Sequence, residues 1–292
     1  MPVADNPFLD QRLVRDSLYA DAGRVAQRSS ALHRAKTHGR YTPDLIAELA
    51  AAQLAARPAK PTRTVPGTAA EGGAALVADV GCGRGSTTLA LAEALPTATI
   101  LAVDLSSALL PEAAMRLRAA ERHPRLVCAD FHKLPLADAS CDLLVAAFCL
   151  YHAPEPTSVI AEFARCLDTR GATILVTKSR DSYEELDLLV AAAGLDPAAA
   201  TRPSLYETAH SANLSALAAT ALTVEQVIHE QHRFRFQGLD HVAEYLATSP
   251  KYDLPIELAG NSTALVAALR AVVPDRPLTL TSTVTLVVAS RE

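Results

Sequence analysis

The segment Val77-Ala78-Asp79-Val80-Gly81-Cys82-Gly83-Arg84-Gly85 constrains the fold of this chain more than any other. Its first residues belong to an apolar run, 75–80, that is typical of a buried strand, and residues 86–95 favour a helix with Ser86 as its cap. Glycine at alternate positions lets the backbone turn sharply and lie against a flat ligand at the start of the helix. The segment therefore predicts a strand, a glycine turn and a helix that together bind a nucleoside.

The spacing of the glycines separates two classes of nucleoside site. Dinucleotide sites use G-x-G-x-x-G and place a pyrophosphate at the helix start. In this chain the third glycine, Gly85, comes one residue early and is followed by serine. Asp79 would repel a pyrophosphate, whereas its carboxylate suits a ligand that carries an ammonium group. The loop thus favours a nucleoside with a positively charged side chain over a nicotinamide dinucleotide.

At all nine positions the segment resembles the first motif of class I S-adenosylmethionine-dependent methyltransferases, hydrophobic-x-D-x-G-x-G-x-G. The resemblance continues in order along the chain, through apolar runs that end at Asp104 and at Asp130-Phe131. It implies S-adenosyl-L-methionine as the cofactor and S-adenosyl-L-homocysteine as the product. Asp104 would take the ribose hydroxyls, a diol that a carboxylate accepts with both oxygens. Asp130 would accept from the adenine amino group, and Phe131 would lie against the ring. The implied cofactor-binding residues in the core are Asp79, Gly81, Cys82, Gly83, Asp104, Leu105, Asp130, Phe131 and Phe148, with Cys82 a small filler of the loop.

Residues 141–156 resemble the fourth strand of the family and the loop that follows it, often written V-L-H-H-x-P-x-P. The resemblance places residues 148–152 against the transferred methyl group. His152 is the candidate catalytic base, and the equally weighted alternative is a hydrogen-bonded wall residue. Relatives carry K-P-G-G before the next strand, whereas this chain has Asp168-Thr169-Arg170-Gly171, so that turn can differ.

A second candidate contact precedes the core. Residues 39–45 are similar to an R-Y-x-P segment that covers the methionine end of the cofactor in some small-molecule methyltransferases. Tyr41 would bond the cofactor carboxylate, with Arg40 adding charge. Alternatively, these residues end one helix and begin another, and Tyr19 is a weaker candidate of the same kind.

The pattern of elements predicts an α/β fold. We expect a seven-stranded, mostly parallel sheet with helices on both faces and an antiparallel last strand at 278–288, where apolar residues alternate with threonines. Residues 224–236 form the strand before it. Ser182 begins a predicted capping box, and Gly194 could close the helix that follows.

Three regions follow from these patterns. Residues 1–70 form a helical N-terminal lead or lid, with no convincing strand before residue 57, and a proline-rich linker at residues 57–68. Residues 71–292 form the methyltransferase core. Within it, residues 237–277 form a helical cap over the pocket of the methyl acceptor.

The composition of the chain limits the classes of partner that it is expected to bind. The net charge of −5 gives no footprint for nucleic acid, and the absence of a long apolar run or signal peptide predicts a cytoplasmic protein without membrane association. The five cysteines are odd in number and include no C-x-x-C pair, which indicates neither a disulfide framework nor a metal site.

We therefore expect an enzyme that transfers a methyl group to O, N or C of a small molecule in specialised, natural-product biosynthesis. The alternatives are a cofactor-binding protein or non-methylating enzyme of the same fold, and a macromolecule methyltransferase. A homodimer is left open. The candidate pocket residues are His152, Lys178, Arg180, Tyr183, Tyr245 and Tyr252.

Overall fold

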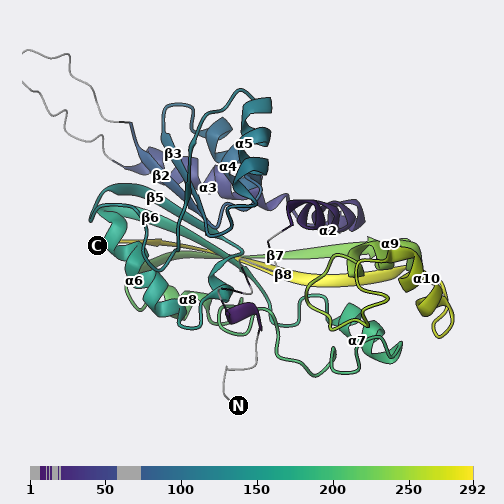
Figure 1. The fold of residues 1–292 in the computed structure, drawn as a ribbon. Helices are drawn as coiled ribbons and strands as arrows, with labels where there is room; N and C mark the ends of the chain where they lie inside the picture. Colours follow the sequence, from purple (N-terminus) through teal and green to yellow (C-terminus); the bar gives the residue numbers. More distant parts are fainter. Residues whose placement is uncertain are drawn as a thin grey trace, which may run out of the picture.

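The computed structural model of the chain describes residues 7–10, 12, 14, 19, 21–57 and 74–291. The linker predicted between residues 57 and 68 falls, apart from Arg57, outside these residues. An eight-stranded sheet in the order β1-β7-β8-β6-β5-β2-β3-β4 crosses the molecule (Figure 1).

Five of the eight strands, β2 to β6, are parallel to one another. β8 is antiparallel to both β6 and β7. The predicted α/β fold, with a mostly parallel sheet and an antiparallel last strand, is therefore confirmed. The strands are β1 Lys36–His38, β2 Leu76–Val80, β3 Thr99–Asp104, β4 Arg125–Cys128, β5 Cys141–Ala147, β6 Leu167–Lys178, β7 Thr223–Phe236 and β8 Leu278–Ser290.

The expectation that no strand precedes residue 57 is wrong, because β1 lies at Lys36–His38. Its three residues pair antiparallel with β7 and form the edge of the sheet there. A sheet edge presents unpaired amides and carbonyls that a short segment can satisfy, whatever its hydrophobic pattern. Three residues are too few for such a pattern to show.

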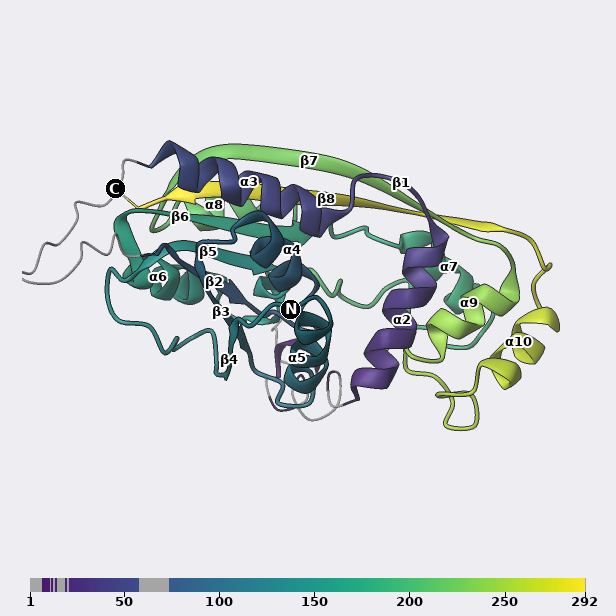
Figure 2. The ribbon, with the colours of Figure 1, turned by 90° about the horizontal axis from the view of Figure 1, so that it is seen from above.

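Helices cover both faces of the sheet, as predicted (Figures 1 and 2). On one face lie α3 Thr42–Ala56, α4 Ser86–Ala94 and α5 Leu110–Ala119, and on the other lie α6 Pro156–Cys166 and α8 Leu214–Ala218. Leu45, Ile46 and Ala50 of α3 pack with Leu91 of α4 and with sheet residues in one buried cluster. The division of the chain at residue 70 stays a prediction, and α3 belongs to the packing of the sheet.

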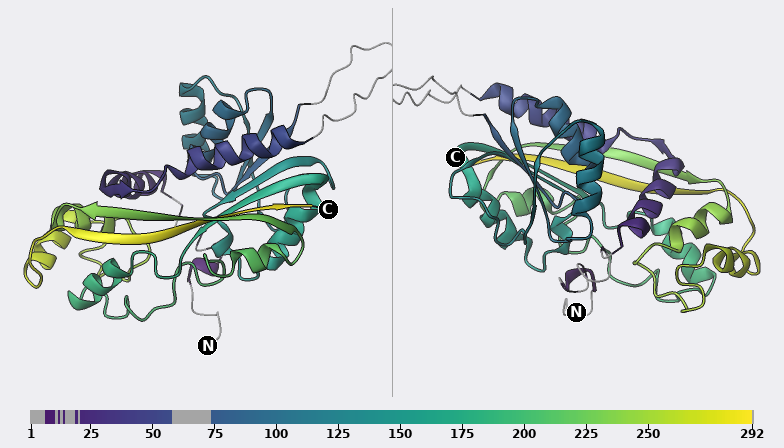
Figure 3. Two further views of the ribbon diagram at one scale, coloured as in Figure 1. Left: turned by 180° about the vertical axis from the view of Figure 1, so that it is seen from behind. Right: turned by 45° about the horizontal axis from the view of Figure 1, so that its top comes forward.

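A second apolar cluster lies at the far end of the long β7–β8 hairpin. Only residues 284–290 of β8 pair with β6, while residues 278–283 pair with β7 alone. Four helices surround this projecting half (Figure 3): α2 Ala22–Ala35, α7 Glu184–Ala192, α9 Leu239–Leu246 and α10 Ser262–Arg270. Their buried side chains pack with Phe236 and Leu280 in what we call the hairpin-end cluster. α9 and α10 fall within the predicted cap, 237–277, whose role stays a prediction.

Two predicted helix caps are wrong. α4 begins after Gly85, which has a left-handed backbone (φ 77°), so Ser86 is its first residue and not its cap. α7 begins after Tyr183, also left-handed (φ 69°), and Ser182 Oγ instead contacts the hydroxyls of Ser179 and Ser282. Gly194 does end α7 as predicted, with φ 68° and its amide donating to the carbonyl of Ala191.

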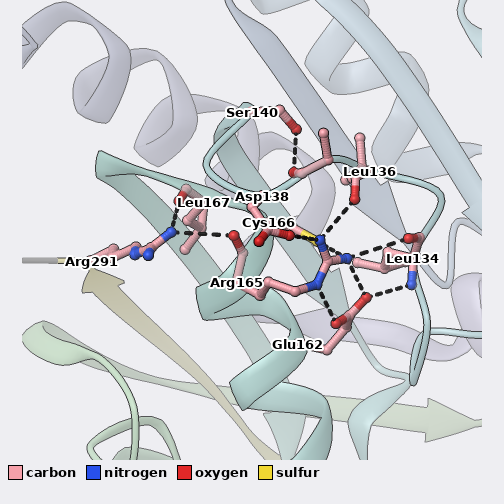
Figure 4. A network of polar contacts seen from close by, with 10 residues as sticks. Leu134, Leu136, Asp138, Ser140, Glu162, Arg165, Cys166, Leu167 and Arg291 are labelled. Atoms are coloured by element: carbon pink, nitrogen blue, oxygen red, sulfur yellow. Dashed lines mark hydrogen bonds and ion pairs between the residues drawn. The ribbon is translucent and has the colours of Figure 1, made fainter.

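A polar network holds the loop between β4 and β5 against α6 (Figure 4). The Arg165 guanidinium donates to Glu162 and Asp138 and to the carbonyl of Leu136. Glu162 in turn accepts from the Leu134 amide at 2.7 Å, and Arg291 donates to the carbonyls of Arg165 and Leu167. The network thereby fixes the loop that contains Phe131.

Candidate functional site

A cavity of about 390 Å³ opens at the carboxyl ends of the parallel strands. The last residues of four strands, Val80, Asp104, Ala147 and Lys178, lie in its wall. Along the chain, strands are added outward in one direction from β2 to β4 and in the other from β5 to β6. Open α/β sheets bind ligands at such a switch point.

Three glycines shape the turn after β2. Gly81, Gly83 and Gly85 have φ of 72°, 52° and 77°, the left-handed region that other residues rarely adopt. The amide of Gly81 donates to the Val103 carbonyl at 2.8 Å, which closes the turn against β3. A Cβ on Gly81 would lie 2.5 Å from Cys149 Cβ, whereas a Cβ on Gly83 would meet nothing within 4 Å. Gly81 is thus required by packing, and Gly83 leaves open space in the cavity wall.

Asp104 presents an oriented carboxylate to the cavity. Its Oδ2 accepts from the Gly83 amide at 2.7 Å and its Oδ1 from the Ser106 amide at 2.8 Å. Burial raises the pKa of this carboxyl, and the two amides oppose that effect. Each oxygen keeps a further lone pair, so the group can accept two more hydrogen bonds, as a vicinal diol requires.

Asp79 lies directly behind the cavity wall and is 1% exposed. Its Oδ2 accepts from the Thr88 hydroxyl at 2.5 Å, while its buried Oδ1 meets no hydrogen-bond donor in the described part of the chain. Burial raises the pKa of Asp79 to about 7. An unsatisfied buried acceptor of this kind is costly, and a nearby ammonium group would stabilise its charged form.

Leu105, Phe131 and Phe148, for which cofactor contacts are predicted, also lie in the cavity wall. Cys82 is buried outside this wall, and burial raises the pKa of its thiol, which fits the filler role. Asp130 is likewise outside the wall: its Oδ1 accepts from the His132 amide at 2.9 Å and lies 2.7 Å from His132 Nδ1. The structure thus brings most of the predicted residues together but turns Asp130 toward its own loop.

The structure places Tyr41 away from the cavity. Its side chain is 44% exposed and packs edge-on against His33, and Arg40 pairs with Glu48. Tyr19, the weaker candidate, does line the cavity. Its carbonyl accepts from Ser106 Oγ at 2.9 Å, which fastens this part of the N-terminal segment to the residue after Leu105.

His152, at the end of the short 3-10 helix Leu150–His152, has both ring nitrogens engaged. Nδ1 lies 2.9 Å from the Phe8 carbonyl and Nε2 lies 3.1 Å from the Tyr19 hydroxyl. A carbonyl only accepts, so Nδ1 carries the proton and Nε2 accepts from Tyr19. Burial lowers the pKa of His152 to about 4. This geometry favours the wall residue over the base, because the nitrogen that would take a proton already accepts a hydrogen bond.

Beyond Phe148, aromatic and basic side chains line what we call the β6 side of the cavity. Lys178, Tyr183 and Tyr245 were predicted here, whereas Arg180 pairs with Glu207, and Tyr252 bonds Asp187 outside the wall. Arg28, Tyr206 and Lys251 also line this side, and the sequence does not predict them. They come from three separate segments without a motif, so no local pattern could have found them.

Within the described residues, no cluster of His, Cys, Asp and Glu has the arrangement of a metal site. Among those same residues, every helix is too short or too polar to span a bilayer.

The known proteins that this chain resembles include methyltransferases, in agreement with a cavity whose residues suit a nucleoside cofactor. Residues 78–175 match a family described as a methyltransferase domain. The chain is 36% identical over 167 residues to a putative 23S rRNA (guanine-N(1)-)-methyltransferase from Micromonospora griseorubida, a match that covers 55% of this chain and 52% of that protein. It is 35% identical over 173 residues to a malonyl-[acyl-carrier protein] O-methyltransferase from Alcanivorax borkumensis, covering 56% of this chain and 58% of that one.

The fold is shared with the crystal structure of a putative methyltransferase from Bacillus halodurans, at 18% identity and a TM-score of 0.53, over 83% of this chain and 97% of the other. The chain spans little more than half the length of the curated relatives described above. Residues 78–175 therefore contain a methyltransferase domain, and the solved structure shows that the chain shares the fold.

Proposed function

We propose that the chain is a class I S-adenosylmethionine-dependent methyltransferase, which transfers a methyl group from S-adenosyl-L-methionine to O, N or C of a small molecule in natural-product biosynthesis. One observation carries the proposal. A single cavity has an oriented carboxylate, Asp104, on its β3 side and an aromatic and basic chamber on its β6 side. The first suits the nucleoside, and the second suits an acceptor next to it.

The residues of the β3 side fit the cofactor. Asp104 would accept from the ribose hydroxyls, and Phe131 would lie against the adenine. The unsatisfied Oδ1 of Asp79 lies behind the glycine turn, where an ammonium group would compensate it. When bound, the cofactor would supply an activated sulfonium methyl, the acceptor would lose its proton to solvent, and S-adenosyl-L-homocysteine would be the product.

The protein's part in this transfer is to hold the acceptor in line and to exclude water. Phe8, Val14 and Tyr19 of the N-terminal segment lie in the cavity wall, and His152 holds two of them. His152 therefore acts as a positioning residue in this proposal and not as the base.

The decisive experiment has two stages. Calorimetry with S-adenosyl-L-homocysteine and, separately, with NADH should show binding of the first alone. Radiolabelled S-adenosyl-L-methionine should then label molecules of low molecular mass in a metabolite extract, while purified ribosomal RNA and total protein stay unlabelled. Absence of S-adenosyl-L-homocysteine binding would refute the cofactor, and labelling of RNA or protein would refute the small-molecule acceptor.

A further inference from the structure

The Lys178 ammonium lies inside the cavity wall, enclosed by aromatic rings. Its Nζ lies 4.6 Å from the centre of the Tyr183 ring, 5.3 Å from that of Phe148 and 6.0 Å from that of Tyr206. It donates to the Tyr183 hydroxyl at 2.6 Å. Ring faces and one phenol stabilise a cation only in part, because none of them carries a negative charge.

The charged groups that shift the pKa of Lys178 are all of its own sign. Arg28 and Lys251 lie in the same wall, and Lys36 lies nearby outside it. Asp187 pairs with Lys251 at 2.6 Å, whereas Arg28 donates to the Thr248 carbonyl. No carboxylate of the described residues pairs with Lys178 or Arg28. Burial, followed by these like charges, lowers the pKa of Lys178 to about 7. An isolated buried cation is costly, so this side of the cavity is built for a negative charge that the described side chains do not supply.

The strand order separates Lys178 from the cofactor side. Lys178 ends β6, whereas the glycine turn follows β2 and Asp104 ends β3, and β5 with Phe148 lies between them. Neighbouring strands are about 4.8 Å apart, which puts the end of β6 roughly 10 Å from the glycine turn. The negative charge that Lys178 lacks therefore belongs to the acceptor side.

We propose that Lys178 is a specificity-determining residue that anchors a carboxylate of the methyl acceptor. The proposal rests on the proposed function and narrows it to flat, carboxylate-bearing small molecules. Tyr151, Tyr183, Tyr206 and Tyr245 supply the walls for the flat part, since all of them line the cavity together with Phe148. The Tyr183 hydroxyl, which already accepts from Lys178, is free to donate its own proton to the same carboxylate.

The test uses the full chain saturated with S-adenosyl-L-homocysteine. Calorimetry measures the binding of aromatic carboxylates, from benzoate and 4-hydroxybenzoate to two-ring analogues, each compared with its neutral amide. The best carboxylate should bind at least about tenfold more tightly than its amide, the difference expected for one charge-assisted hydrogen bond. Lys178→Met should remove this preference, and Lys178→Arg should keep part of it.

Lys36→Met is the matched control, because it removes a neighbouring positive charge that does not line the cavity. It should leave the preference within about twofold, the effect of a distant and screened charge. Lys178→Met should also leave the affinity for S-adenosyl-L-homocysteine unchanged, and melting curves check that each variant folds.

Three results would overturn the inference: carboxylates that bind no better than their amides, a preference that survives Lys178→Met in folded protein, or a loss of S-adenosyl-L-homocysteine affinity in that variant. The last would assign Lys178 to the carboxylate of the cofactor. The proposed function fails separately, if the wild-type protein does not bind S-adenosyl-L-homocysteine at all.

Discussion

The backbone amide of Gly83 donates a hydrogen bond of 2.7 Å to Oδ2 of Asp104. This hydrogen bond joins the turn after β2 to the acid at the end of β3 before a ligand binds. Preorganisation of this kind spares the free energy of ordering both groups during binding.

Asp104→Asn should weaken the binding of S-adenosyl-L-homocysteine about 100-fold. The amide group of Asn would face either the Gly83 or the Ser106 amide with its own donor, and one charged acceptor for the diol would be lost. Calorimetry measures the change. Asp44→Asn, at an exposed position in the first turn of α3, is the control and should change nothing. Equal affinity in both variants would refute the ribose role.

Gly81→Ala should mainly lower the stability of the protein, and Gly83→Ala should mainly lower its affinity for S-adenosyl-L-homocysteine. Both add strain in the left-handed region, about 1 kcal/mol each. Only Gly81→Ala also places a methyl group 2.5 Å from Cys149 Cβ, so it should lower the melting temperature much further. Gly83→Ala should stay folded and lose S-adenosyl-L-homocysteine affinity, because its methyl group enters the cavity. If Gly83→Ala binds normally, the cofactor does not approach this turn closely.

Asp79→Asn should stabilise the ligand-free protein while weakening cofactor binding. The folded-state pKa of about 7 exceeds the ordinary 3.8, so between these pH values the folded protein holds a proton that the unfolded chain has released. The contribution of Asp79 to the free energy of unfolding therefore falls as pH rises from about 4 to 7. At pH 8 the variant should be more stable than wild type in urea unfolding, because Asn has no charge to bury. A variant less stable than wild type at pH 8 would contradict this account of the carboxylate.

Tyr19→Phe should lower kcat/KM about fivefold, whereas Tyr41→Phe should have no effect. The first change removes the hydroxyl that donates to His152 Nε2, a loss of about 1 kcal/mol. The second alters an exposed ring outside the cavity. Steady-state kinetics with the acceptor found by radiolabelling measures both, and the opposite ranking would restore Tyr41 as the cofactor contact.

Carboxylate binding should weaken as pH rises above 7. Lys178 is positively charged below its pKa of about 7 and loses that charge above it, under the influence of burial and of Arg28, Lys36 and Lys251. Binding of the anion favours the charged form, so the midpoint should move upward as the carboxylate concentration rises. Titrations of benzoate and benzamide from pH 6 to 9 measure this, with the amide as the pH-independent control. A carboxylate affinity that does not change across this range would contradict the role of the ammonium.

Long, periodic segments could be predicted from the sequence, and tertiary contacts could not. β7 and β8 begin and end within two residues of their predicted bounds, because alternation over ten or more residues is unambiguous. The predicted caps at Ser86 and Ser182 are wrong because Gly85 and Tyr183 occupy the cap positions, each with a left-handed backbone.

In the candidate site, too, residues within short motifs could be predicted, and residues brought together by tertiary packing could not. Gly81, Gly83 and Asp104 lie within short motifs, and the structure brings them to one cavity. Arg28 reaches that cavity from α2 and Lys251 from the loop after α9, so their meeting depends on how the hairpin-end cluster packs. Tyr41, in contrast, belongs to a segment that resembles a motif, yet the structure places it on the surface.

The projecting half of the β7–β8 hairpin has an apolar cluster of its own, separate from the two clusters that cover the sheet. Tyr183 and Tyr245 are rooted in the hairpin-end cluster, whereas the strands that end at the glycine turn and at Asp104 pack in the clusters of the sheet. Under the proposed function, substitutions in the hairpin-end cluster would alter the acceptor side of the cavity and leave the glycine turn and Asp104 in place.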